Sequence, residues 1–197
     1  MSYNAAPSGS EPEPALVLES AWNVVAVRAA EDRVASHPAG PDLMARAATG
    51  LFHRCLRLLK WRRGVYGARV VMLVGRGNNG GDTLFAGARL AARGCSVTAI
   101  VAADDVGQAH RPGLDALRAE RGRAMSAALP TVTGELIAGA HLILDGLVGI
   151  GGRGALREPA AGLARAARAA HERGALVVAV DLPSGVDADT GEVPDPD

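Results

Sequence analysis

The chain has 197 residues, of which 48% are hydrophobic, and this is enough to bury the core of one domain. Basic and acidic residues balance at 21 each, so the formal net charge is zero, which argues against a nucleic-acid-binding protein. No apolar run approaches the ~20 residues of a membrane span, and no signal peptide is recognised, so we expect a cytoplasmic chain without a membrane partner. The two cysteines, Cys55 and Cys95, lie in apolar contexts, as buried free thiols of a reducing compartment do.

The first part of the chain combines a tail with two predicted helices. Residues 1–15 are rich in Ser, Pro, Glu and Ala and show little periodicity, so we expect residues 1–20 to be a disordered tail and residues 21–197 to form one domain. Helical patterns follow at 22–36 and 41–61, separated by a break that contains proline and glycine. The second predicted helix has one apolar face, made of Leu43, Ala47, Leu51, Cys55 and Leu58.

Beyond residue 69, predicted strands and helices alternate. The run 69–74 is continuously apolar and β-branched after its first residue, as in a strand buried on both faces. Further strands are predicted at 96–102, 123–127, 141–147 and 175–180, and helices at 82–93, 108–121, 134–139 and 158–173. This alternation predicts an α/β fold with a mainly parallel sheet and helices on both of its faces. Because a doubly wound sheet usually continues after such a strand, we expect the fold to be truncated at its C-terminus.

Two glycine-rich segments follow predicted strands, at the edge where open α/β sheets bind ligands. Both fit the pattern G-x-G-x-x-G, with the glycines Gly75, Gly77 and Gly80 in the first and Gly149, Gly151 and Gly154 in the second. Glycines permit positive φ and close backbone approach, so that N–H groups can point at a phosphate. Tight turns without a ligand are the alternative. No Gly-Lys-Ser/Thr follows the first segment, which argues against an ATPase.

Polar side chains at the same edge predict a cation site. The carboxylate of Asp145, the amide of Asn79 and the hydroxyl of Ser184 would supply oxygen ligands, which hard cations prefer. With so few carboxylates, potassium is more plausible than calcium. The alternatives are structural, since Asn-Gly is common in turns and Asp145 could cap one.

Asp181 ends the last predicted strand, where a carboxylate could act as a general acid/base or could cap the turn before Pro183. Asp104 follows the second predicted strand, about where a dinucleotide dehydrogenase holds a ribose hydroxyl, or it is a solvated loop charge. The absence of a substrate domain and of an evident hydride-transfer pair weakens the dehydrogenase alternative. For Asp187, Asp189 and His110 we expect structural roles.

Taken in order, three motifs resemble those of the NAD(P)H-hydrate epimerases, the YjeF N-terminal domain family. They are Asn-Asn-Gly-Gly-Asp at 78–82, the loop that runs from Asp145 to Gly154, and Asp-Leu-Pro-Ser-Gly-Val-Asp at 181–187. The likeness spans roughly residues 22–194, with Glu31 and residues 43–47 resembling the family's N-terminal helices. It implies a Rossmann-like three-layer α/β/α fold.

The resemblance also implies a reaction and a set of site residues. Such enzymes interconvert the R and S epimers of NADHX and NADPHX, the hydrated forms of NADH and NADPH, so that a stereospecific ADP/ATP-dependent dehydratase, fused or separate, can repair both. Asp181 would be catalytic, and Asn79, Asp145 and Ser184 would hold potassium. The substrate would be contacted by Asn78, Asn79, Gly80, Gly81, Asp82, Gly149, Ile150, Gly151, Gly152, Arg153, Gly154, Ala155 and Asp181. A homodimer is expected, and a non-catalytic nucleotide- or partner-binding scaffold is the alternative function.

Overall fold

The computed structural model describes residues 22–37, 42–128 and 130–194, so the predicted tail lies outside the described part. Five parallel strands form one sheet in the order β3-β2-β1-β4-β5. The strands are β1 Arg69–Val74, β2 Ser96–Val101, β3 Arg123–Ser126, β4 Leu142–Gly146 and β5 Leu176–Ala179. The helices are α1 Val24–Ala35, α2 Leu43–Arg62, α3 Asn78–Ala92, α4 Arg111–Ala119, α5 Pro130–Ala138 and α6 Ala160–Glu172, with a short 3₁₀ turn at Val106–Gln108.

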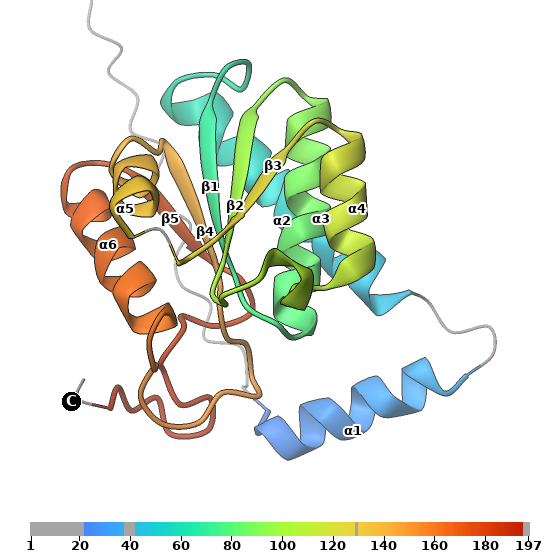
Figure 1. Cartoon of the computed structure of the whole chain (residues 1–197). Coiled ribbons are helices and arrows are strands. Elements are labelled where there is room, and N and C mark those ends of the chain that lie inside the picture. Colours follow the sequence, from blue (N-terminus) through green and yellow to red (C-terminus); the bar gives the residue numbers. More distant parts are fainter. Residues whose placement is uncertain (1–21, 38–41, 129, 195–197) are drawn as a thin grey trace, which may run out of the picture.

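Helices cover both faces of the sheet, which confirms the predicted three-layer α/β/α fold. Figure 1 shows α2, α3 and α4 on one face and α5 and α6 on the other. Strand β1 is central and almost wholly buried, and its side chains alternate between two apolar clusters. Val70, Met72 and Val74 join the cluster under α2, α3 and α4, while Val71 and Leu73 join the one under α5 and α6. This two-sided burial explains why the strand reads as a continuous apolar run.

Helix α2 packs with a different face from the one predicted. It buries Ala48, Phe52, Cys55 and Leu59; of the predicted face, Cys55 is fully buried and Leu51 packs against the core from a half-buried position. Both stripes have helical spacing, but this one places the ring of Phe52 in the core, while Trp61 stays exposed. The two thiols are free and buried, as predicted, and burial raises the pKa of Cys55 to about 12 and that of Cys95 to about 11.

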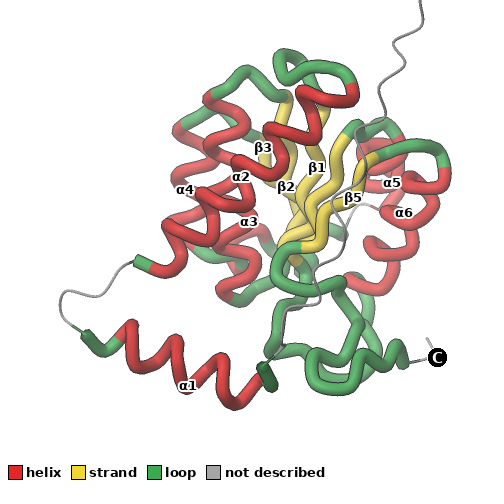
Figure 2. Tube along the Cα trace, turned by 180° about the vertical axis from the view of Figure 1, so that it is seen from behind, coloured by secondary structure: helices red, strands yellow, loops and turns green. Residues whose placement is uncertain are grey.

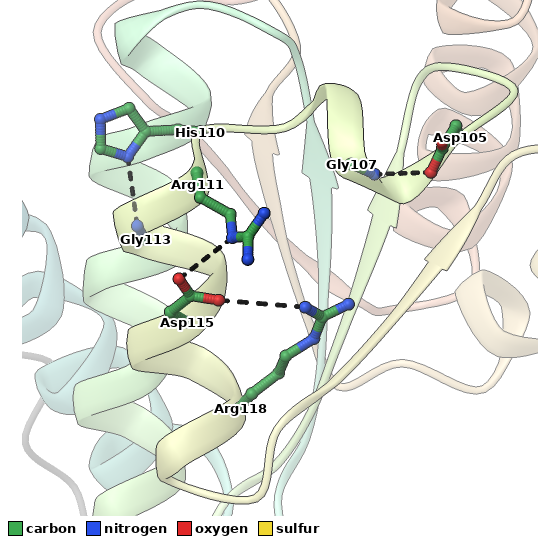
Figure 3. Close-up of polar contacts among 7 residues, drawn as sticks. All are labelled: Asp105, Gly107, His110, Arg111, Gly113, Asp115 and Arg118. Carbon is green, nitrogen blue, oxygen red and sulfur yellow. Dashed lines mark hydrogen bonds and ion pairs between the residues drawn. The ribbon is translucent and has the colours of Figure 1, made fainter.

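His110 is the N-cap residue of α4, and its Nδ1 accepts a hydrogen bond from the backbone N–H of Gly113 at 3.2 Å (Figure 3). On the exposed side of the helix, Asp115 lies 3.2 Å from Arg111 and 4.0 Å from Arg118. Exposed pairs of this kind contribute about 0.3–0.5 kcal/mol each to stability. The histidine therefore has the structural role that was predicted for it.

The loops that follow β1, β4 and β5 emerge at one edge of the sheet, the lower edge in Figure 1. Helix α1 lies beside this edge, apart from the other helices, and Figure 2 shows the same arrangement from behind. Its first backbone N–H, at Val24, donates to Asp189 Oδ1 in the loop after β5 at 2.8 Å. The fold thus brings the polar motifs and α1 to the same end of the molecule. No helix in the described part of the chain is long and apolar enough to cross a membrane.

Candidate functional site

The Asn-Asn-Gly-Gly-Asp motif forms the first turn of α3, where the sequence predicted a loop. The helix begins at Asn78, four residues before the predicted start at Asp82, and Gly77 is its extended N-cap residue. Close packing explains the difference. A Cβ on Gly80 would collide with the backbone carbonyl of Gly75, and one on Gly81 would lie 3.0 Å from the ring of His110. These glycines let the helix start approach β1 and α4 closely, and neither requires positive φ.

Asp181 faces the second glycine-rich segment from the end of β5. Its backbone has φ +69°, a left-handed conformation that asparagine and aspartate adopt more readily than other non-glycine residues. Its Oδ2 accepts a hydrogen bond from the backbone N–H of Ile150 at 2.8 Å. A Cβ on Gly149 would lie 2.5 Å from this Oδ2 and 3.2 Å from Cγ of Asn79. Because Gly149 has no side chain, Asp181 and Asn79 can both lie close to it.

Asp145 and Ser184 are in direct contact. Ser184 Oγ donates to Asp145 Oδ1 at 2.6 Å, and the Ser184 backbone N–H donates to Oδ2 at 2.9 Å. The same hydroxyl oxygen accepts from the backbone N–H of Val148 at 3.0 Å. These bonds tie the loop after β5 to the end of β4. Asn79 lies against Gly149 in the loop after β4, so the three predicted potassium ligands border one stretch of backbone, 145–149.

Several polar atoms at this edge are buried without a hydrogen-bond partner in the described structure: Asn79 Oδ1 and Nδ2, and Asp82 Oδ1. Such atoms are rare in native structures, because each costs about 1–3 kcal/mol of desolvation. Burial, followed by the charges of Asp181, Glu31 and Asp42, raises the pKa of Asp82 to about 6. Acidic groups from four different segments thus converge here.

The second glycine-rich segment lines a cavity of about 310 Å³ at the same edge. Arg76 from the end of β1, Arg153, and Gly185 from the loop after β5 also line it. Of the segment's glycines, Gly154 alone has positive φ, at 71°. Gly151 and Arg153 are exposed, so the segment is open to solvent. A second cavity, of about 350 Å³, lies at the opposite edge of the sheet and includes none of the predicted site residues.

Asp104, the candidate ribose ligand of the dehydrogenase alternative, is exposed and makes no hydrogen bond to another described residue. Its neighbour Asp105 accepts a hydrogen bond from the backbone N–H of Gly107 at 2.7 Å and so begins the 3₁₀ turn (Figure 3). In the loop after β5, Asp187 Oδ1 accepts from the backbone N–H groups of Asp189 and Thr190, as predicted for a loop-stabilising role. The described residues contain no cluster of three or more His, Cys, Asp or Glu side chains suited to a metal.

Three residues near the site were not predicted: Asp42, at the start of α2, and two residues of α1. Arg28 reaches the glycine-rich segment, because a Cβ on Gly151 would lie 2.6 Å from its Nη2. Glu31 is close enough to Asp82 for its charge to raise the pKa of that group. The two residues are three positions apart and so share one face of the helix. Residue spacing on α1 indicates the shared face, but nothing local indicates that this face meets the site.

Comparisons with known proteins agree on one family. Residues 40–196 match the family model described as YjeF-related protein N-terminus. The Mycobacterium leprae protein named "Bifunctional NAD(P)H-hydrate repair enzyme Nnr" is 41% identical over 89% of this chain, which spans 34% of that protein's length. The Clavibacter michiganensis protein named "NAD(P)H-hydrate epimerase" is 35% identical over 93% of this chain and 77% of its own length. The crystal structure of yeast ynu0, YNL200c, is similar in fold, with a TM-score of 0.71 and 20% identity over 87% of this chain and 74% of its own.

Proposed function

Because the chain belongs to the YjeF N-terminal family, we propose that it is an NAD(P)H-hydrate epimerase, which interconverts the R and S epimers of hydrated NADH and NADPH. The observation that carries the proposal is the convergence of Asp82, Asp181, Glu31 and Asp42, where Asp181 is bonded to the glycine-rich loop that lines the cavity. This convergence argues against a non-catalytic scaffold, because like charges and unpartnered buried atoms lower stability and a scaffold has no use for them.

The acidic cluster suits a reaction that passes through a cation. The hydrated ring carries its hydroxyl group on C6, next to the ring nitrogen. When the hydroxyl leaves, the nitrogen lone pair forms a double bond to C6, and the ring becomes an iminium-like cation. Carboxylates already in place around the ring stabilise that charge without rearranging as it develops. Their mutual repulsion in the free protein is relieved by the same cation.

Asp181 is the general acid/base in this scheme. It donates a proton to the C6 hydroxyl, which departs as water, and its carboxylate remains beside the cation. A water molecule then adds to the opposite face of C6 and returns a proton to a carboxylate, so that the substrate's atoms and charge are restored with C6 inverted. The hydrogen bond from Ile150 N–H supports this role, because it orients one carboxylate oxygen and leaves the other available.

Potassium fits the residues that border the stretch 145–149. The unpartnered Oδ1 of Asn79 is an available oxygen ligand, and the contacting pair of Asp145 and Ser184 supplies carboxylate and hydroxyl oxygens. We propose that these three residues hold the ion. Bound potassium would supply positive charge that offsets the acidic cluster and would stiffen the loops around the cavity.

The longer relatives suggest a wider context. Since the Mycobacterium leprae protein is named bifunctional and this chain matches about a third of it, we infer that the chain corresponds to the epimerase part of such a repair enzyme. The dehydratase and a homodimer stay predictions from the resemblance, and the cytoplasmic location stays a prediction from the sequence.

The proposal is tested by incubating the purified chain with a single epimer of NADPHX, with and without potassium, and following the other epimer by chromatography. We expect interconversion well above the spontaneous rate, and faster in potassium. A folded chain that binds NADPHX without accelerating interconversion would support the scaffold alternative instead. Circular dichroism on the same sample establishes that the chain is folded.

A further inference from the structure

Helix α1 is held at the site by very little packing. None of the residues 24–34 is fully buried, and the helix contributes nothing to either apolar cluster. Its N-terminal end lies beside the loops after β4 and β5, and the rest of the helix extends away from them (Figures 1 and 2). Val24 is bonded to Asp189 in the loop after β5. Contacts of this kind, rather than packing in the core, hold the helix at the site.

Arg28 reaches from α1 to the second glycine-rich segment. Its guanidinium lies against Gly151, at the position where any larger residue would place its Cβ. No carboxylate in the described part of the chain lies within 4.0 Å of it, so its positive charge is unpaired there. A guanidinium without an anionic partner, held over exposed backbone, is suited to receive an anion.

The backbone under Arg28 is itself an anion receptor. Among the described residues, the N–H groups of Gly151, Arg153 and Gly154 have no hydrogen-bond partner, whereas those of Ile150 and Gly152 are bonded to Asp181 and to Gly149 O. Those of Arg153 and Gly154 are consecutive, and consecutive free N–H groups in a glycine-rich loop suit phosphate oxygens. The loop thus offers donors on one side of a phosphate and Arg28 offers a guanidinium on the other.

We propose that Arg28 is a phosphate-binding residue, which clamps the diphosphate of the dinucleotide against the 149–154 loop and thereby folds α1 over the bound substrate. The inference rests on the proposed function, because it takes the hydrated dinucleotide as the ligand. It adds a residue outside the glycine-rich motif and gives α1 a role in binding. Arg28 acts on the diphosphate end of the substrate, away from the reacting C6.

The test compares Arg28→Ala with Arg33→Ala, which removes the same charge from the last turn of the same helix. Steady-state kinetics with NADPHX should show KM raised about tenfold or more in Arg28→Ala, with kcat within about twofold, while Arg33→Ala matches the wild type. Arg28→Lys should recover part of the loss, because lysine keeps the charge but not the two-pronged geometry. Hydrated nicotinamide riboside, which has no phosphate, should bind wild type and Arg28→Ala equally.

Calorimetric titration with NADPHX separates this inference from the proposed function. Tight binding by the wild type and about tenfold weaker binding by Arg28→Ala, without any epimerisation, would overturn the proposed function and leave the phosphate clamp standing. Equal affinities for Arg28→Ala and the wild type would overturn the clamp, as would equal losses in Arg28→Ala and Arg33→Ala. A wild type that binds no NADPHX overturns both. Far-ultraviolet circular dichroism confirms that each variant keeps its helices.

Discussion

Asp181 is bonded to Ile150 at 2.8 Å across 31 residues of sequence, so the candidate acid/base side chain is oriented by the glycine-rich loop that it faces. The bond joins the loops after β4 and β5 at the edge of the sheet. A strained left-handed backbone at Asp181 is maintained in the same place. Both loops therefore hold the carboxylate in position. An asparagine at position 181 would remove the negative charge and leave both loops in place.

Replacing Asp181 with asparagine should abolish most of the activity and little of the stability. Asparagine tolerates φ +69° and can still accept the hydrogen bond from Ile150, but it cannot exchange a proton. We expect kcat for NADPHX epimerisation to fall about 10²–10⁴-fold, with an almost unchanged melting temperature. Asp181→Ala, by contrast, should also lose about 1–2 kcal/mol of stability, because alanine pays for the left-handed conformation. Full activity in Asp181→Asn would remove this residue from the mechanism.

Gly149 is predicted to be intolerant of even a methyl group. An alanine there would bring its Cβ to 2.5 Å from Asp181 Oδ2 and 3.2 Å from Asn79, so one of these side chains must move. We expect Gly149→Ala to lose at least tenfold in kcat/KM, measured with NADPHX, as is typical of small displacements in an active site. The matched control is Gly134→Ala in α5, where nothing lies within 4 Å of the added group. Activity lost equally in both variants would point to a general effect of the substitution.

The buried elements were the most predictable part of the chain. The bounds predicted for β1 are those observed, because its neighbours on both faces demand an unbroken apolar run. The start of α3 was predicted too late, because Asn-Asn-Gly-Gly has turn propensity locally and only packing against Gly75 and His110 makes it helical. Arg28 and Glu31 were beyond prediction as site residues, since their role depends on where α1 lies. The hydrophobic periodicity of a sequence can predict a helix, but it does not predict where a loosely packed helix lies in the fold.

Ser184 should control the response to potassium. Its hydroxyl bridges Asp145 and the backbone of Val148, and in our proposal it also faces the ion. Raising potassium should increase the melting temperature of the wild type, since a ligand at 100 times its Kd adds about 2.7 kcal/mol of stability. Ser184→Ala should need at least tenfold more potassium for the same effect, and for half-maximal activity.

Two comparisons make the potassium prediction specific. Sodium or choline chloride at equal ionic strength should not reproduce the effect on the wild type. Ser126→Ala, which also removes a hydroxyl that accepts a backbone hydrogen bond, from Ala128, should keep the wild-type potassium response. A potassium response unchanged by Ser184→Ala would place the ion elsewhere or exclude it.

Asp82 should make the free protein less stable as the pH rises from 4 to 6. Its folded pKa of about 6 lies above its ordinary value of 3.8, so the folded chain holds this proton more tightly than the unfolded chain does. Below pH 4 the group is protonated in both states and does not lower the free energy of unfolding. Between pH 4 and 6 the unfolded chain is favoured progressively, and above pH 6 the full penalty applies, up to about 3 kcal/mol before solvent screening reduces it.

Asparagine at position 82 stays neutral and avoids this penalty. In potassium-free buffer, Asp82→Asn should therefore be more stable than the wild type by about 1–2 kcal/mol at pH 8, with the difference vanishing near pH 4. Urea denaturation across this range measures it, and Asp104→Asn, at an exposed site, should show no comparable gain. A pH-independent difference would mean that the carboxyl group is not the source. If the same variant loses epimerase activity while gaining stability, then the buried carboxylate of Asp82 lowers the stability of the folded chain but is needed for activity.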